Sequence, residues 1–193
     1  MTGASVDCEA IGGSWWGQPV NTLTAFAFLG VAVLIWARRR DLVTSLLVAM
    51  IGVGSIAFHG PMPPWGEYLH DLAIVWMLVW ILAVDLDRRE WSVWAMVLAA
   101  LASITPAIAD PVQAGLAVAV IVAELRAPTQ RKAHRRAVGL LAVGAVVGTL
   151  SRTGWPLCNP DSIWQGHGFW HVASAAALAI WALGTTEKEA AVA

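Results

Sequence analysis

Four of the five histidines in this sequence lie at the ends of apolar segments, where their imidazoles could meet at one depth. His167 and His171 both open the last apolar segment. Their spacing of four places the two rings on one face of a helix, about one turn apart. A helix that supplies two ligands to one zinc ion uses this spacing. Because chance pairs with this spacing are common, a structural polar pair is the alternative.

His59 is the candidate third ligand, because it closes the second apolar segment on the side where the last one opens. Three imidazoles plus one open position form a standard catalytic zinc arrangement, although imidazoles also suit other divalent ions. The sequence therefore predicts a zinc site made by His59, His167 and His171. We expect His70 to be an interface histidine first and a reserve ligand second. We expect His134, which lies among basic residues, to be solvated.

Two polar residues near this site could take part in hydrolysis. Ser55 precedes His59 by four residues and therefore faces the same side of a helix. Its hydroxyl could donate to a developing oxyanion or hold the attacking water, whereas the alternative is a hydrogen bond to the carbonyl one turn back. Asp71 enters a membrane helix, where a carboxylate needs a partner or a metal site. We expect Asp71 to be either the general base or the acceptor of a histidine N–H.

The composition indicates that these side chains belong to a membrane protein. Hydrophobic residues make up 58% of the chain and charged residues 13%, whereas soluble domains carry about a quarter charged residues. The net charge of -1 gives no indication of nucleic-acid binding. A helix needs roughly 20 apolar residues to span a bilayer. The sequence predicts an all-α bundle of seven transmembrane helices, at 21–37, 42–59, 67–86, 91–108, 111–125, 134–151 and 167–184.

The fourth and fifth of these segments are the least regular. The fifth is short, and it follows the fourth across Pro106, Asp110 and Pro111. Residues 91–125 therefore form either two full spans or a re-entrant hairpin. A hairpin returns to the side that it left, so the two alternatives give the same sidedness for the other loops.

The basic residues predict the orientation of the bundle. Of the 12 Lys and Arg residues, only Arg152 falls in a loop on the side of residues 1–20. Cytoplasmic loops carry an excess of basic residues, so we expect the N-terminus outside and the C-terminus in the cytoplasm. The residues on the cytoplasmic side are Arg38, Arg39, Arg40, Arg88, Arg89, Arg126, Arg131, Lys132, Arg135, Arg136 and Lys188.

This orientation divides the chain into an extracytoplasmic segment at 1–20, a membrane domain at 21–184 and a cytoplasmic tail at 185–193. It also places Cys8 and Cys158 on the outer side, where an oxidising environment permits a disulfide. We expect a Cys8–Cys158 disulfide, with two free thiols as the alternative. No segment indicates an obligate protein partner.

Three patches of the sequence resemble the alkaline ceramidase family. They are G-S-I-A-F-H at 54–59 with the aspartate at Asp71, Q-G-H-G-F-W-H at 165–171, and D-C-E at 7–9 followed by Q-P-V-N-T at 18–22. The wider group is a superfamily of seven-helix hydrolases that also contains adiponectin-type receptors. The resemblance extends over most of the chain, although only these patches match as motifs.

The resemblance implies a zinc-dependent amidase that cleaves the N-acyl bond of ceramide-like membrane lipids. It assigns zinc to the three histidines named above, and it gives Asp71 and Ser55 roles in assisting the water and the oxyanion. It also implies that the two cysteines form a disulfide. The compact chain with its short loops looks bacterial, so we expect a bacterial plasma membrane. Since many bacteria make no sphingolipid, another N-acyl lipid or an ester is the alternative substrate.

The resemblance is incomplete at the N-terminus, where eukaryotic members bind calcium through an acidic cluster. Asp7 and Glu9 are present, but Gln18 stands where the family has an acid, and Ile11 replaces a polar ligand. Calcium takes about six to eight oxygen ligands. Two carboxylates make a poor site, so we do not expect calcium here.

Two other classes of protein remain open from the sequence. A receptor or lipid-binding protein would use the same histidines as a structural zinc site, with little or no turnover. A transporter would need polar residues through the midplane, and the inner halves of the segments offer almost none beyond Asp85 and Asp87 near the inner boundary. We therefore expect a hydrolase whose active site lies near the outer face of the membrane.

Overall fold

The computed structural model describes residues 3–13, 15–102, 104, 106–126 and 131–184. All regular secondary structure in these ranges is helical, which confirms the all-α fold class. The expected cytoplasmic tail at 185–193, with Lys188, lies outside the described residues. The helices of the described chain are η1 (Gly3–Val6), α1 (Pro19–Arg39), α2 (Leu42–His59), α3 (Gly66–Asp85), η2 (Arg89–Trp91), α4 (Ser92–Ala102), α5 (Pro106–Arg126), α6 (Arg131–Leu150) and α7 (Gly166–Gly184).

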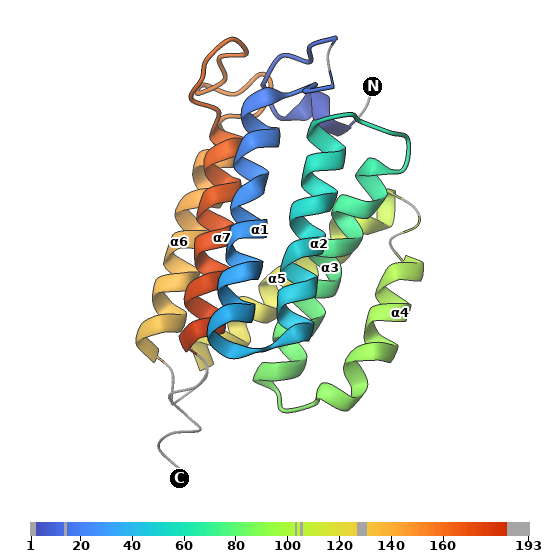
Figure 1. Ribbon diagram of the computed structural model, residues 1–193, viewed down its shortest axis with the longest axis vertical. Coiled ribbons are helices and arrows are strands. Elements are labelled where there is room, and N and C mark those ends of the chain that lie inside the picture. Colours follow the sequence, from blue (N-terminus) through green and yellow to red (C-terminus); the bar gives the residue numbers. More distant parts are fainter. Residues whose placement is uncertain (1–2, 14, 103, 105, 127–130, 185–193) are drawn as a thin grey trace.

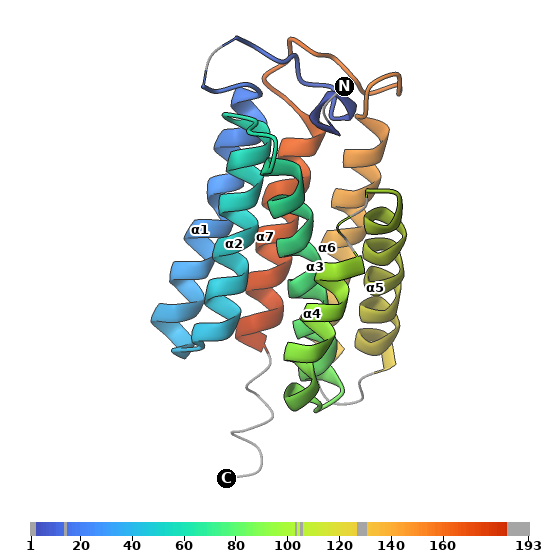
Figure 2. The ribbon, with the colours of Figure 1, turned by 90° about the vertical axis from the view of Figure 1, so that its right-hand side faces the viewer.

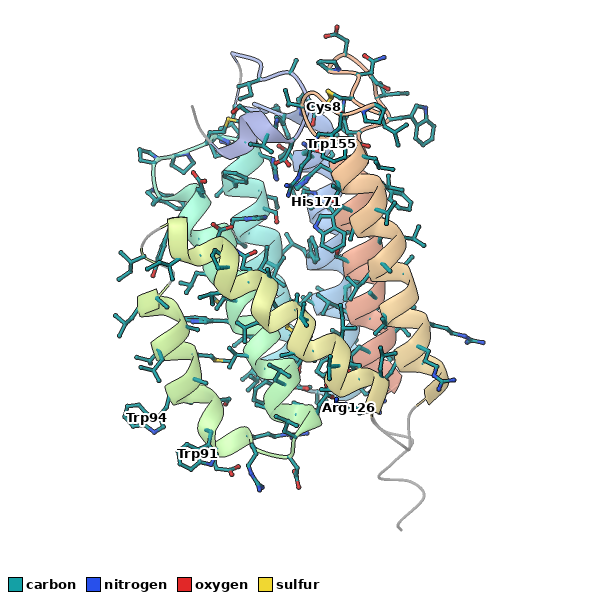
Figure 3. The ribbon with its side chains drawn as sticks, turned by 180° about the vertical axis from the view of Figure 1, so that it is seen from behind. Cys8, Trp91, Trp94, Arg126, Trp155 and His171 are labelled. Atoms are coloured by element: carbon teal, nitrogen blue, oxygen red, sulfur yellow. A yellow bond between two sulfur atoms is a disulfide. The ribbon has the colours of Figure 1, made fainter. Side chains whose placement is uncertain are left out.

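Most of the α-helices form a ring, and α4 lies at its edge. α1 packs between α2 and α7, and α3 packs between α2 and α5. α6 closes the ring between α5 and α7, whereas α4 packs mainly against α3. Figures 1 and 2 show this arrangement, and Figure 3 shows α5 running obliquely across the side between α3 and α6.

Successive helices run in opposite directions, so the ring has two distinct ends (Figure 1). The disulfide end holds Cys8 and Cys158, together with the loop between α6 and α7. The arginine end holds the turns after α1 and α3, with Arg40 and Arg88. α2 therefore ends at the disulfide end, where α7 begins.

A tight turn between α1 and α2 fixes this reversal. Arg40 adopts a left-handed backbone conformation with φ 54°, and its N–H donates to the carbonyl oxygen of Trp36 at 3.0 Å. Asp41 then caps α2, because its side chain accepts the N–H of Thr44 at 3.0 Å. Both contacts satisfy backbone groups that a helix end leaves without partners.

α1 is apolar on the faces that lie inside and outside the ring. Phe28 and Ile35 are 3% and 0% exposed, whereas Leu23 and Val33 are 59% and 68% exposed. A helix that is hydrophobic on all sides lies in a protein core or in a membrane. α1, α2 and α3 are each long and apolar enough to cross a membrane. The fold is thus consistent with a membrane protein.

The structure corrects the boundaries of the fourth and fifth segments. α4 ends at Ala102 rather than at residue 108, and its 11 residues extend about 16 Å. That length is well below the roughly 30 Å of a bilayer's hydrocarbon core. α5 begins at Pro106 rather than at residue 111. Proline suits the first helical position because its missing N–H needs no partner there, so Pro106 starts the helix.

His134 also differs from its expected environment. α6 begins at Arg131, so His134 lies in the first turn of this helix. Its side chain is 3% exposed and forms an ion pair with Glu124 of α5. The expectation of a solvated histidine was wrong because α5 and α6 pack against each other at this point and exclude solvent.

Candidate metal centre

The three predicted histidines gather at the disulfide end, between α2 and α7. His59 is the last residue of α2, and His167 and His171 lie in the first two turns of α7. The His59 ring centroid lies 4.8 Å from that of His167 and 5.1 Å from that of His171. The centroids of His167 and His171 are 4.6 Å apart. The spacing of four within α7 and the reversed direction of α2 together produce this cluster.

His59 and His171 are oriented by oxygen atoms from the start of α1. His59 Nδ1 lies 2.6 Å from Gln18 Oε1, and His171 Nδ1 lies 3.1 Å from the backbone oxygen of Asn21. Thr24 Oγ1 lies 3.2 Å from the same nitrogen of His171 and donates its own proton to a backbone carbonyl. Because all these oxygens accept, the proton of each neutral imidazole resides on Nδ1. Nε2 then carries the lone pair, as in histidines that bind a metal.

His167 is oriented in the same way by the N-terminal segment. Its Nδ1 lies 3.1 Å from Asp7 Oδ1, and carboxylates are frequent partners of metal-binding histidines. In the part of the chain that the structure describes, the Nε2 atoms of His59, His167 and His171 are buried and have no hydrogen-bond partner. The candidate ligand atoms of Asp7, His59 and His167 all lie within 4.8 Å of one another. The candidate ligand atoms of His171 lie within the same distance of those of His59 and His70, so His59 links two overlapping groups. Either group could hold a divalent metal ion.

Gln18 connects the N-terminal segment to this centre. Its side chain is fully buried, and its Nε2 donates to the backbone oxygens of Ala4 and Glu9, both at 2.9 Å. These two hydrogen bonds leave Oε1 as the atom that faces His59. The position of one candidate ligand therefore depends on a segment that precedes the first long helix.

The structure confirms the expected disulfide. The sulfur atoms of Cys8 and Cys158 are 2.05 Å apart, and their Cα atoms are 5.5 Å apart. The bond ties the residue next to Asp7 to the loop that leads into α7. It thereby holds the carboxylate of Asp7 against the helix that carries His167.

Both acidic residues of the N-terminal segment have partners within the chain. Glu9 accepts the backbone N–H of Val20 at 2.7 Å and that of Asn21 at 2.9 Å, in the first turn of α1. A carboxylate at this position interacts favourably with the helix dipole. Asp7 faces His167. These carboxylates thus support the start of α1 and one histidine of the cluster.

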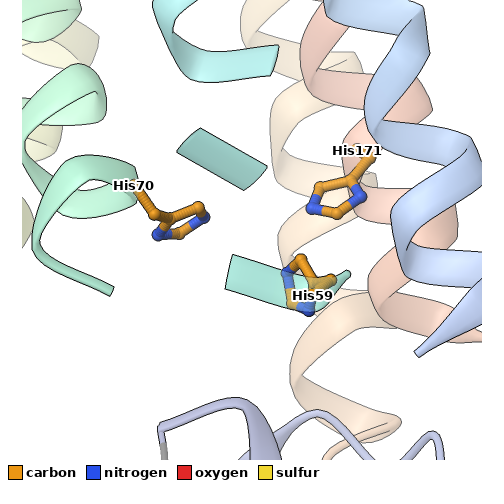
Figure 4. A group of neighbouring side chains, drawn as sticks. All are labelled: His59, His70 and His171. Atoms are coloured by element: carbon orange, nitrogen blue, oxygen red, sulfur yellow. The ribbon is translucent and has the colours of Figure 1, made fainter. Parts of the chain in front are cut away.

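His70 lies at the edge of the same cluster. Its ring stacks on Phe58 with centroids 5.0 Å apart, in the interface between α2 and α3. The candidate ligand atoms of His59, His70 and His171 also lie within 4.8 Å of one another. Figure 4 shows these three side chains converging from α2, α3 and α7. His70 is therefore an interface residue that also lies close enough to be a reserve ligand.

Asp71 contacts the cluster through His70. Its Oδ1 lies 3.0 Å from His70 Nδ1, and its side chain is 22% exposed. This contact is compatible with both roles that the sequence leaves open, because a carboxylate that accepts a histidine N–H can also take up a proton. A Cβ atom at Gly54 would lie only 2.9 Å from the Cα of His70. Glycine at this position therefore permits α3 to approach α2 closely enough to bring His70 and Asp71 to the site.

Ser55 lies one turn before His59 in α2 and is 1% exposed. Its Oγ has no hydrogen-bond partner among the residues that the structure describes. The alternative expected from the sequence, a hydrogen bond to the carbonyl one turn back, is therefore not seen. A buried hydroxyl of this kind could donate to a substrate oxygen.

Sequence reasoning missed the residues that orient the histidines. Gln18, Asn21 and Asp7 belong to the N-terminal patches of the family resemblance, but the expectation for these patches concerned calcium. The polar side chains before the first apolar helix could have indicated such contacts, because polar groups at the entry to a membrane helix need partners. Which partners they have could not be predicted, since most of this segment lacks a regular period.

Comparisons with known proteins assign no family to the chain. No protein-family model matches it, and no curated protein is significantly similar to it. The function is therefore argued from the residues and the geometry described above.

Proposed function

We propose that this protein is a zinc-dependent membrane hydrolase that cleaves the N-acyl bond of ceramide-like lipids and releases a fatty acid. The observation that carries the proposal is the orientation of His59, His167 and His171, whose Nδ1 atoms all face accepting oxygens. A buried polar atom without a partner costs roughly 1–3 kcal/mol. The three rings lie with centroids 4.6–5.1 Å apart, and each leaves a buried Nε2 lone pair without a partner among the described residues. A shared metal ion would accept these lone pairs, and zinc is the usual ion for three imidazoles.

In this proposal the chain crosses a bacterial plasma membrane seven times, with α4 as the short segment. The disulfide end faces outside and the arginine end faces the cytoplasm. The distribution of basic residues supports this orientation, because Arg38 and Arg39 end α1 and Arg88 follows α3, all at the arginine end. The exposed apolar faces of α1 support contact with lipid. The metal centre then lies near the outer face of the membrane.

The substrate class rests on the resemblance and on the depth of the histidines. Three patches of the sequence are similar to alkaline ceramidases, which cleave an amide between a fatty acid and a lipid amine. His59 ends one helix and His167 begins another, so the cluster lies at the depth of a lipid's polar linkage. The head group would face outside, and the acyl chain would remain among the helices.

Lewis-acid activation of a water molecule and of the scissile carbonyl is the chemistry that a zinc ion supplies when bound. The chain's own residues do the rest. Gln18, Asp7 and Asn21 hold the three rings in the tautomer that presents Nε2. Ser55 donates a hydrogen bond to the carbonyl oxygen as negative charge develops on it.

Asp71 and His70 hold the proton that the water gives up. Asp71 Oδ1 lies 3.0 Å from His70 Nδ1, so a proton taken by this pair is shared between a carboxylate and an imidazole. Water oxygen adds to the carbonyl carbon, and the carbon–nitrogen bond then breaks. The stored proton passes to the nitrogen, which leaves as an amine. One water is consumed, and one fatty acid and one amine are released.

Fatty-acid release by the purified protein tests this proposal. The panel contains ceramides, other N-acyl lipids and acyl esters, each presented in mixed micelles with and without a chelator. We expect release from at least one N-acyl lipid, loss of that release with the chelator, and recovery on adding zinc. A receptor-like protein with a structural zinc site would bind zinc but release no fatty acid from any substrate. That outcome would overturn the assignment as a hydrolase.

A further inference from the structure

A second cluster of titratable side chains lies at the arginine end, at the opposite end of the ring from the histidine cluster. We call it the acidic trio; its members are Asp85, Glu124 and His134. Asp85 ends α3, Glu124 lies in the last turn of α5, and His134 lies in the first turn of α6. Their candidate ligand atoms all lie within 4.8 Å of one another. Three helices thus contribute one side chain each to a single point.

Two members of the acidic trio are buried, and Asp85 is half-buried. Glu124 is 6% exposed and His134 is 3% exposed, and the two side chains form an ion pair. Within the described ranges, Asp85 Oδ2, Glu124 Oε1 and His134 Nε2 are buried and have no hydrogen-bond partner. Buried polar atoms in native proteins nearly always have partners. A ligand shared by the three side chains would satisfy atoms that have no partner among the described residues.

The charges of the acidic trio favour a cationic ligand. Asp85 and Glu124 carry two negative charges when ionised, and a protonated His134 supplies only one positive charge. A buried charge without compensation is strongly unfavourable. A divalent cation balances both carboxylates, and it also accepts the lone pair of a neutral imidazole.

We propose that the acidic trio is a second metal site, which binds a divalent first-row transition ion such as Mn²⁺ or Zn²⁺. Carboxylates suit Mn²⁺ and imidazole suits Zn²⁺, and both ions accept the mixed set of ligands. Water completes the coordination. The site fixes the ends of α3, α5 and α6 to one another at the arginine end, as the disulfide fixes the opposite end. It does not depend on the proposed hydrolase activity.

Binding of Mn²⁺ to the full chain in detergent tests this site. The parent variant carries His59→Gln and His171→Gln, which remove the histidine shared by both candidate groups at the disulfide end and a second ligand of one of them. The parent protein is freed of metal with a chelator and titrated with Mn²⁺, and the concentration of free Mn²⁺ is followed by its EPR signal. We expect one equivalent to bind, with pulsed EPR showing coupling to one imidazole nitrogen. Adding Glu124→Gln should weaken binding at least about tenfold.

Glu90→Gln in the same parent is the matched control, because Glu90 is an exposed acid at the arginine end. This variant should retain the bound equivalent. A folded parent that binds no Mn²⁺ would overturn the proposal, and so would equal binding by the Glu124→Gln and Glu90→Gln variants. If Glu124→Gln does not give a monodisperse protein, the nitrogen coupling in the parent decides. Its presence supports the site, and its absence overturns it.

Discussion

Replacing Gln18 with Met removes the oxygen that orients His59, with little change in side-chain volume. Gln18 is fully buried, its Oε1 lies 2.6 Å from His59 Nδ1, and its Nε2 donates to two backbone carbonyls. Loss of such a partner behind a metal-binding imidazole typically costs about 10- to 100-fold in metal affinity. At about 1.4 kcal/mol per tenfold change, this is about 1.4–2.8 kcal/mol of binding free energy. We expect the zinc dissociation constant to rise by that factor.

The same substitution also affects stability. Two backbone carbonyls lose a donor, and the imidazole N–H of His59 and the side-chain amide of Asn21 lose their acceptor. Each unsatisfied buried group costs roughly 1–3 kcal/mol. The N-terminal segment remains attached through the disulfide, so the disturbance stays local. We expect the melting temperature to fall while the helical circular dichroism stays unchanged.

The assay is competition for zinc with a chromophoric chelator in detergent. Every protein carries Glu124→Gln, so that the acidic trio adds no zinc to the count. The matched control is Gln113→Met in α5, because Gln113 Nε2 has no hydrogen-bond partner among the described residues. The control should keep the affinity of the starting protein. Equal zinc affinity for Gln18→Met and Gln113→Met, at equal helical content, would refute the role of Gln18 in orienting His59.

Three further predictions concern the proton, the helix packing and the disulfide. Asp71→Asn should lower fatty-acid release about 100- to 10,000-fold at unchanged zinc content, because an amide does not hold the transferred proton; release near the original rate would show the assignment to be wrong. Gly54→Ala places a Cβ 2.9 Å from the backbone of α3 and should cost about 1–3 kcal/mol in thermal melts. A Cβ at Gly30 would have no atom within 4 Å, so Gly30→Ala should leave the melting temperature unchanged or raise it. Equal melting temperatures for the two variants would contradict the packing argument. Cys8→Ser opens a link between residues 150 positions apart and should lower the melting temperature and speed zinc dissociation; an unchanged dissociation rate would contradict it.

The positions of the clustered histidines could be predicted because they depend on simple regularities of helices. The spacing of His167 and His171 is a property of a single helix. His59 reaches the same end because α2 runs in the opposite direction to α1. The alternation of helix direction also explains why Cys8 and Cys158 were expected on one side, and the structure confirms their bond.

The contacts around these residues depend on tertiary packing, which the sequence pattern does not encode. Gln18 and Asp7 reach the histidines through a segment that is irregular over most of its length. Glu124 and His134 meet only because the ends of α5 and α6 pack together, so a solvated histidine was the natural expectation. The end of α4 at Ala102 was missed because the apolar sequence continues beyond it.

The central claim is that the Nε2 atoms of His59, His167 and His171 bind one zinc ion. Anomalous diffraction at the zinc absorption edge, from crystals of the purified protein, tests this claim directly. We predict an anomalous peak at the disulfide end, about 2.0–2.1 Å from all three Nε2 atoms. A zinc-loaded crystal with no peak between these nitrogens, or with the three rings turned away from one another, would contradict the account.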